Sequence, residues 1–184
     1  MLIKSTEIEN EINYNISSKT TTAAWMATHC LTISAREQYI AKLISMNFPL
    51  DIFGRCGNLS CDRSKFLHCY NEIGRIHKFY FAIENSVCRD YVTEKAILSI
   101  NAGAVPIVLN RQVALNVLPP GSFIALDDFD SPESFANFII ELERNITAYR
   151  EYLQWRYKYT TPGYVMMKFA TSNNRDEKCS RGDL

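Results

Sequence analysis

An acidic and a basic residue stand side by side in a polar stretch of this sequence. Glu94 and Lys95 follow an apolar segment, residues 78–84, and precede residues with helical periodicity. The start of a helix exposes unpaired N–H groups and the positive end of the helix dipole, which together favour phosphate. Lys95 adds a full positive charge, Glu94 can accept hydrogen bonds from ribose hydroxyls, and Asn85 and Tyr91 lie nearby in the chain. The pattern predicts a nucleotide site; the alternative is a first-turn glutamate beside a solvated lysine.

Arg36 is a second cation in a comparable position. It lies in the first turn of a helix predicted after another apolar segment, residues 23–29. A guanidinium group can bind a pyrophosphate through two parallel hydrogen bonds. Because a cation opposes the helix dipole at this end, its placement favours an anion nearby. The alternative is a surface arginine that covers the start of the helix.

The support for a metal site is weak. Residues 127–130 read Asp-Asp-Phe-Asp, which imitates a D-x-D metal motif, but they precede a helix, so a structural turn is favoured. Cys56 and Cys61 form a C-x4-C pair without a second pair, which speaks against zinc. The three histidines share no spacing typical of metal ligands: His29, His68 and His77. No metal cofactor is therefore predicted.

Cysteines and glycosylation triplets bear on the compartment. Cys56 and Cys61 enclose a short loop and can pair with each other if the compartment is oxidising. Buried thiols are expected at three other cysteines: Cys30, Cys69 and Cys88. N-x-S/T triplets at Asn15, Asn58 and Asn145 give mild support for a lumenal protein.

Composition and charge restrict the classes of function. The chain has 184 residues, about the size of one domain, and 47% of them are hydrophobic, enough for a packed core. A formal net charge of zero argues against a nucleic-acid binder but allows a local phosphate site. No run of about 18 apolar residues occurs, and the acidic start of the chain is unlike a signal peptide. The chain as given is expected neither to span a membrane nor to carry a secretory signal.

Apolar segments of strand length alternate with segments of helical periodicity. Ser34 and Glu37 have the spacing of a capping box, and Ser131-Pro132 predicts an N-cap followed by proline at the first helical position. Strands are predicted at residues 23–29, 50–53, 78–84 and 104–109, and further helices at 64–74, after 95 and at 148–158. This alternation predicts an α/β fold with a doubly wound, mostly parallel, Rossmann-like sheet.

This fold class indicates where a ligand would bind. In such sheets ligands lie at the carboxyl ends of the strands, near the starts of the following helices. The loops at 28–37 and 84–95, which hold the two candidate cations, are at this edge. One nucleotide-binding domain is expected over residues 20–158, with a tail or connector at 1–19 and an irregular tail at 159–184.

Several stretches also resemble one enzyme family. KFYFAIENSVCRDYVTEKAILSINAGAVPIVL is similar to the signature of the α1,3/4-fucosyltransferases, a strand ending in F-x-E-N-S, then D-Y-[VI]-T-E-K and G-A-V-P-[VI]-V-L. Three more stretches resemble other segments of that family: LPPGSFIALDDFDSPESFANFI, YREYLQWR and AAWMATHCLTISARE. The pieces keep the family's order and spacing over residues 20–158.

The resemblance implies the C-terminal, donor-binding domain of a glycosyltransferase with two Rossmann-like domains (GT-B). In that family five matching positions line the GDP-fucose site: Arg36, Asn85, Tyr91, Glu94 and Lys95. Arg36 and Lys95 would face the phosphates, and Glu94 the ribose. The implied reaction is inverting transfer of fucose from GDP-fucose to N-acetylglucosamine-containing glycans of glycoproteins or glycolipids, without a metal cofactor.

The same resemblance places other parts of the enzyme outside this chain. The general base is expected in an N-terminal, acceptor-binding domain that is absent here, so no catalytic residue is assigned. The protein would act in the Golgi lumen and would reach the membrane only through a segment absent from this chain. The alternative is a non-catalytic remnant that binds a nucleotide sugar or a partner and lacks the acceptor domain.

Overall fold

A parallel sheet forms the centre of the molecule. The computed structural model describes residues 5–61, 66–87 and 92–159. Within them, parallel strands follow the order β2-β1-β3-β4-β5. Their bounds are β1 (Thr21–Met26), β2 (Leu50–Phe53), β3 (His77–Phe81), β4 (Val105–Val108) and β5 (Ile124–Ala125). The order reverses between β1 and β3, so the sheet is doubly wound, as predicted, with a switch point there.

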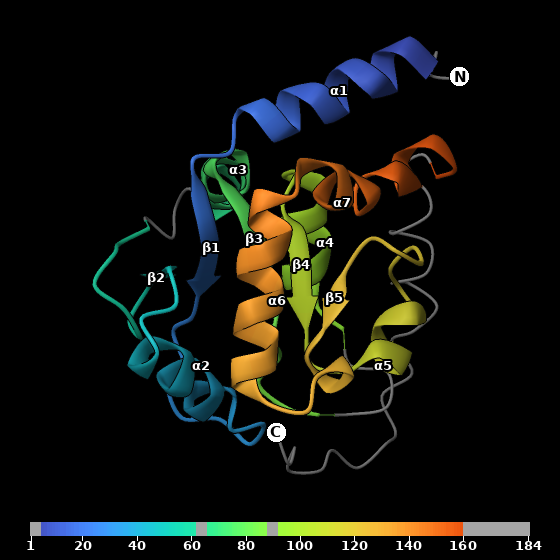
Figure 1. Cartoon of the computed structure of the whole chain (residues 1–184). Helices are drawn as coiled ribbons and strands as arrows, with labels where there is room; N and C mark the ends of the chain where they lie inside the picture. The colour runs from blue at the N-terminus through green and yellow to red at the C-terminus, as the bar shows by residue number, and fades with distance from the viewer. Residues whose placement is uncertain (1–4, 62–65, 88–91, 160–184) are drawn as a thin grey trace.

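Helices cover both faces of the sheet (Figure 1). On one face lie α2 (Arg36–Ser45) and α6 (Pro132–Arg144), and on the other α3 (Phe66–Ile76) and α4 (Glu94–Asn101). Successive side chains along a strand point to opposite faces of the sheet, so adjacent residues join the cores on the two faces. Phe79 and Phe81 join the core under α2 and α6, whereas Tyr80 joins the core under α3 and α4. Burial on both faces explains why the central strands are apolar throughout.

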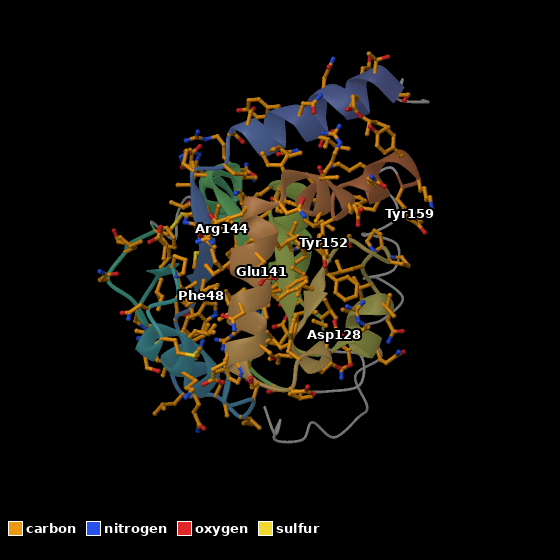
Figure 2. All side chains as sticks on the ribbon, in the orientation of Figure 1. Phe48, Asp128, Glu141, Arg144, Tyr152 and Tyr159 are labelled. Atoms are coloured by element: carbon orange, nitrogen blue, oxygen red, sulfur yellow. A yellow bond between two sulfur atoms is a disulfide. The ribbon has the colours of Figure 1, made fainter. Side chains whose placement is uncertain are left out.

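Aromatic rings fill the core beneath α6. The ring centroid of Phe135 lies 5.8 Å from that of Phe81 and 6.1 Å from that of Phe48, whose place in the molecule Figure 2 labels. The helix starts as its sequence predicts. The Ser131 side chain accepts from the Ser134 N–H, and Pro132 occupies the first helical turn, so the predicted N-cap is confirmed.

Several predicted boundaries differ from the structure. β1 ends at Met26 rather than residue 29, and β3 ends at Phe81 rather than residue 84. The helix predicted at 148–158 is divided into α7 (Ile146–Glu151) and the 3-10 helix η3 (Gln154–Tyr157). Three short elements have too few residues for a clear period and were not predicted: α5 (Arg111–Leu115), β5 and η2 (Leu126–Asp128).

Much of the expected N-terminal tail or connector is a helix, α1 (Ser5–Ser17). α1 lies beside α7 and η3, across the end of the sheet where the strands begin (Figure 1). Its Ile8 and Ile12 are buried, and Arg156 Nε donates to Glu11 Oε1 over 3.1 Å. Three isoleucines, Ile8, Ile12 and Ile16, pack against the core from among mostly polar neighbours. The sequence predicted only a tail or connector here and did not indicate the helix.

Candidate functional site

A cleft of about 860 Å³ opens at the carboxyl ends of the strands, beside the switch point between β1 and β3. The loops after β1, β2 and β3 and the start of α4 line it. Four of the residues predicted to bind a nucleotide are in this lining: Arg36, Asn85, Glu94 and Lys95. The fifth, Tyr91, lies outside the described residues. The two predicted cations therefore border one cavity.

Arg36 is buried at the edge of this cleft, with 2% of its surface exposed. Its Nη1 donates to Ile83 O over 2.6 Å, and its Nη2 donates to His29 O over 3.2 Å. The guanidinium carbon lies 5.4 Å from the ring centroid of Trp25, within cation–π range. The alternative of an exposed arginine is therefore wrong, and the charge is held in a fixed position.

The backbone before α2 brings Arg36 to the end of β3. Ser34 Oγ donates to Glu84 O over 2.7 Å, and the Ser34 N–H donates to Asn85 O over 3.0 Å. Together with Ile83 O, which accepts from Arg36, three consecutive carbonyl groups thus accept from Ser34 and Arg36. The loops after β1 and β3 are thus joined by hydrogen bonds at the switch point.

The capping box predicted for α2 is wrong. The residue before the helix is Ala35, in the left-handed region with φ of 55°, and its side chain makes no cap. Ser34 bonds to Glu84 instead, 50 residues away in the sequence. Glu37 turns back to the loop, where its Oε2 accepts from Thr32 Oγ1 over 2.9 Å. Local spacing predicted that Ser34 caps the helix, but its hydroxyl group bonds to a residue that is distant in the sequence.

Glu84 holds the start of α4 in place. Its carboxylate is largely buried, and its Oε1 accepts from both the Thr93 N–H over 2.8 Å and Thr93 Oγ1 over 2.5 Å. Its Oε2 lies 2.7 Å from Lys95 Nζ. Glu84 was not predicted among the nucleotide-binding residues. Its signals were an acidic side chain at the end of an apolar strand and its place in the E-N-S part of the family signature.

Lys95 and Glu94 differ in exposure although they are adjacent. The Lys95 side chain is 17% exposed and Glu94 is 53% exposed, with 3.7 Å between Lys95 Nζ and Glu94 Oε1. Lys95 Nζ also donates to Thr93 Oγ1 over 2.7 Å. Lys95 is thus a shielded, oriented cation rather than a solvated one, and Glu94 remains open to solvent.

The loop after β2 contributes a third cation, Arg55, which was not predicted because this loop has no periodicity. Arg55 Nε donates to Thr28 O over 3.2 Å. The loop packs closely on the end of β1: Gly54 has φ of 88°, and a Cβ there would stand 2.6 Å from Ala27 O. Glycine is required at this turn for both reasons.

Two disulfides brace the loops around the cleft, Cys30–Cys56 and Cys61–Cys69. The predicted pairing of Cys56 with Cys61 is wrong, and so are the buried thiols expected at Cys30 and Cys69. Cys30 follows β1 and Cys56 follows β2, so the first disulfide links neighbouring loops that the parallel sheet brings together. Cys88 lies outside the described residues.

Tyr70, from α3, adds a neutral hydroxyl group to the lining of the cleft. Tyr80 Oη donates to Tyr70 Oη over 3.1 Å. Burial raises the pKa of both hydroxyl groups well above the ordinary value. They therefore stay uncharged at physiological pH and do not repel an anion in the cleft.

The acidic segment at 127–130 has a structural role at another place. Asp128 Oδ1 accepts from Arg111 Nε over 2.7 Å, and Asp127 Oδ1 accepts from the Arg111 N–H over 2.9 Å. Arg111 lowers the pKa of Asp128, and Figure 2 shows Asp128 close to α5. These carboxylates fasten the start of α5, in agreement with the structural turn favoured from the sequence.

The sheet order and the cleft at its switch point define the class of this protein as a Rossmann-like α/β domain. Residues 16–181 match the model of the C-terminal domain of glycosyltransferase family 10 (fucosyltransferase). The chain therefore belongs to the family-10 fucosyltransferases, and the resemblance noted in the sequence is confirmed.

Curated relatives agree with this assignment. The alpha-(1,3)-fucosyltransferase fut-1 of Caenorhabditis elegans is 39% identical over 145 residues, which are 78% of this chain and 33% of the relative. Human alpha-(1,3)-fucosyltransferase 4 is 38% identical over 152 residues, 78% of this chain and 27% of the relative. The chain thus spans about a third or less of the length of these relatives.

A solved structure shows the same fold. A crystal structure of an alpha1,3-fucosyltransferase with GDP-fucose matches with a TM-score of 0.64 at 19% identity, covering 94% of this chain and 52% of that chain. The predicted α/β class and its relation to one half of such an enzyme are confirmed.

Proposed function

We propose that this chain is the donor-binding half of an α1,3-fucosyltransferase and that its cleft binds GDP-fucose. One observation carries the proposal: Arg36 and Lys95, from the starts of two helices, line a single cleft at the switch point of the sheet. Two shielded cations suit a diphosphate, whose oxygens accept charge-assisted hydrogen bonds. The GDP-fucose named for the solved relative supports the choice of nucleotide sugar.

The residues of the cleft have separate tasks in this proposal. Arg36 and Lys95 bind the diphosphate, and the exposed carboxylate of Glu94 accepts from the ribose hydroxyls. Asn85 lines the same cleft. Tyr91 completes the donor site by resemblance to the family. No metal is needed, because protein cations neutralise the diphosphate.

Glu84 positions Lys95 for this task. The ammonium group is already oriented by Glu84 Oε2 and Thr93 Oγ1 before a ligand arrives. Groups that are oriented in advance lose little freedom on binding, which increases their contribution to affinity and catalysis. Glu84 acts through Lys95 and α4 rather than by contact with the nucleotide.

In the proposed reaction an acceptor hydroxyl attacks the anomeric carbon of fucose. The new carbon–oxygen bond forms while the bond to the diphosphate oxygen breaks, and GDP leaves with the electron pair through an oxocarbenium-like transition state. The hydroxyl proton passes to a general base. Glu84 is bonded to Lys95 and Thr93 and is unsuited to this role. We place the base in the part of the family's length that this chain does not span.

The acceptors in this proposal are N-acetylglucosamine-containing glycans of glycoproteins or glycolipids, and the place of action is the Golgi lumen. The two disulfides support an oxidising compartment. None of the helices in the described ranges combines the length and apolar character needed to cross a bilayer. Co-localisation of the native protein with a Golgi marker in fixed cells tests the location.

Calorimetric titration of the folded chain with GDP tests the donor site. We expect GDP to bind equally well with and without a chelator, and ADP to bind more weakly. Binding that disappears on chelation would favour a metal site. A folded chain that does not bind GDP would refute the proposed function.

A further inference from the structure

The three N-x-S/T triplets of the sequence lie in different environments in the fold. Asn15 lies in the last turn of α1 and is only 9% exposed. Its Oδ1 packs so closely against Gly103 that a Cβ on that glycine would collide with it. A sugar on the Asn15 amide would have to displace α1 from the turn between α4 and β4. This triplet is incompatible with a glycan in the folded protein.

Asn58 has the opposite environment. It is exposed in the loop between β2 and α3, at the rim of the cleft. Leu59, the residue after Asn58, holds this loop in place. The Leu59 N–H donates to Ile52 O over 3.1 Å, and the Gly54 N–H donates to Leu59 O over 2.9 Å. These backbone bonds hold the triplet in a turn in which the asparagine is exposed. A glycan here requires no rearrangement of the core.

Asn145 is also exposed, and its side chain caps α7. The Asn145 Oδ1 accepts from the Ala148 N–H over 3.0 Å. N-glycosylation takes place on the amide nitrogen and leaves the carbonyl oxygen of the side chain as an acceptor. The cap and a glycan at Asn145 are therefore compatible.

The disulfides supply independent evidence on the compartment. Disulfides form and persist in oxidising places such as the lumen of the endoplasmic reticulum, which is where N-glycans are added. Cys56 and Cys61 lie on either side of the Asn58 triplet, and each is in a disulfide. The loop that presents Asn58 is thus braced by the same chemistry that indicates a lumenal protein.

We propose that the folded protein carries N-linked glycans at Asn58 and Asn145 and none at Asn15, with the Asn58 glycan standing at the rim of the donor cleft. The inference rests on the lumenal part of the proposed function. The donor is a lipid diphosphate oligosaccharide of the secretory pathway. A bond forms between the asparagine Nδ2 and the anomeric carbon, the bond from that carbon to the lipid diphosphate breaks, and one amide proton is released.

The test uses the full chain, directed into the secretory pathway of insect cells by a signal peptide. The secreted monomer is treated with an amidase that removes N-glycans, and the modified asparagines are located by peptide mass spectrometry. Three matched variants remove one triplet each but keep the asparagine: Ser17→Ala, Ser60→Ala and Thr147→Ala.

We expect Ser60→Ala and Thr147→Ala each to lose one glycan and Ser17→Ala to lose none. A variant that combines Ser60→Ala with Thr147→Ala should be insensitive to the amidase. Asn58→Gln provides a second variant at the cleft and should match Ser60→Ala. A glycan on Asn15 in the secreted monomer, or an unmodified Asn58, would overturn the proposal. Because the signal peptide ensures entry into the lumen, this result is independent of the imaging and GDP titration that test the proposed function.

Discussion

Lys95 Nζ lies 2.7 Å from Glu84 Oε2, and their side chains are only 17% and 8% exposed. The pair joins the end of β3 to the first turn of α4, across the loop that resembles the family's donor-binding segment. A charge that is shielded from water depends strongly on its partner, because removal of one member leaves the other uncompensated. The proposed donor site is therefore coupled to the stability of this part of the fold.

Glu84→Ala should lower the free energy of unfolding by about 2–4 kcal/mol, because it removes the counter-ion of Lys95 and the acceptor of the Thr93 N–H together. Glu84→Gln keeps an oxygen for Thr93 and should cost less. Urea denaturation of the two variants and the unmodified chain measures both effects. Equal losses in the two variants would contradict the capping role of Glu84.

Lys95→Ala should weaken GDP binding by about 1.5–3 kcal/mol, roughly ten- to hundredfold, the range for one charge-assisted hydrogen bond. Lys42→Ala is the matched control, since Lys42 is half exposed on α2 and pairs with Glu133 over 2.9 Å. Calorimetric titration should show a change only for Lys95. The same affinity for both variants would leave Lys95 with a structural role alone.

Gly54→Ala should destabilise the protein more than Gly121→Ala. Both glycines have a positive φ, 88° and 77°, so alanine in either place costs about 1–2 kcal/mol of backbone strain. Only at Gly54 does the added Cβ also meet Ala27 O, whereas nothing lies within 4 Å at Gly121. The difference in Tm between the two variants, measured by thermal unfolding, reports the effect of the close contact with Ala27 O. Equal shifts in Tm would show that the loop after β2 adapts.

Stability should rise with pH above neutrality because of Lys19. Burial, with a smaller effect of Arg156, lowers the pKa of Lys19 from 10.5 to about 7 in the folded protein. Between these values the unfolded chain binds a proton that the folded chain does not, so the free energy of unfolding increases with pH.

Urea denaturation between pH 7 and about 8.5 measures this slope, below the range in which tyrosines ionise in the unfolded chain. Lys19→Met should flatten the slope, while Lys42→Met, at an exposed position, should keep it. A slope that is unchanged in Lys19→Met would show that other groups produce it.

The chain alone should bind GDP-fucose and transfer no fucose. General-base catalysis is worth about 10²–10⁴-fold, and orientation of two reactants accounts for roughly 7–11 kcal/mol of a barrier. Both are assigned here to a part of the enzyme outside this chain. Radiolabelled GDP-fucose with N-acetylglucosamine-bearing acceptors, including chitobiose-core N-glycans, provides the assay. Robust turnover by the purified chain would contradict this division, and Glu84 and Glu94 would be the first residues to mutate.

The sequence by itself determined the class of fold and the edge of the sheet where the candidate site lies. Alternating apolar segments and helical stripes are local patterns, and β2 and the Ser131 cap were predicted from them at the residues where they occur. Parallel strands then bring their carboxyl ends to one edge, so Arg36 and Lys95 could be placed at one cleft without coordinates.

Only the tertiary structure decided which distant groups meet at that edge. Ser34 bonds to Glu84 across 50 residues, and Cys30 pairs with Cys56 rather than Cys56 with its near neighbour Cys61. The burial of Arg36, which distinguishes it from an exposed surface charge, results from such contacts. Local patterns report the preferences of neighbouring residues. The partners of a buried polar group depend on how strands and helices pack, and the group must find them there because burial without a partner is costly.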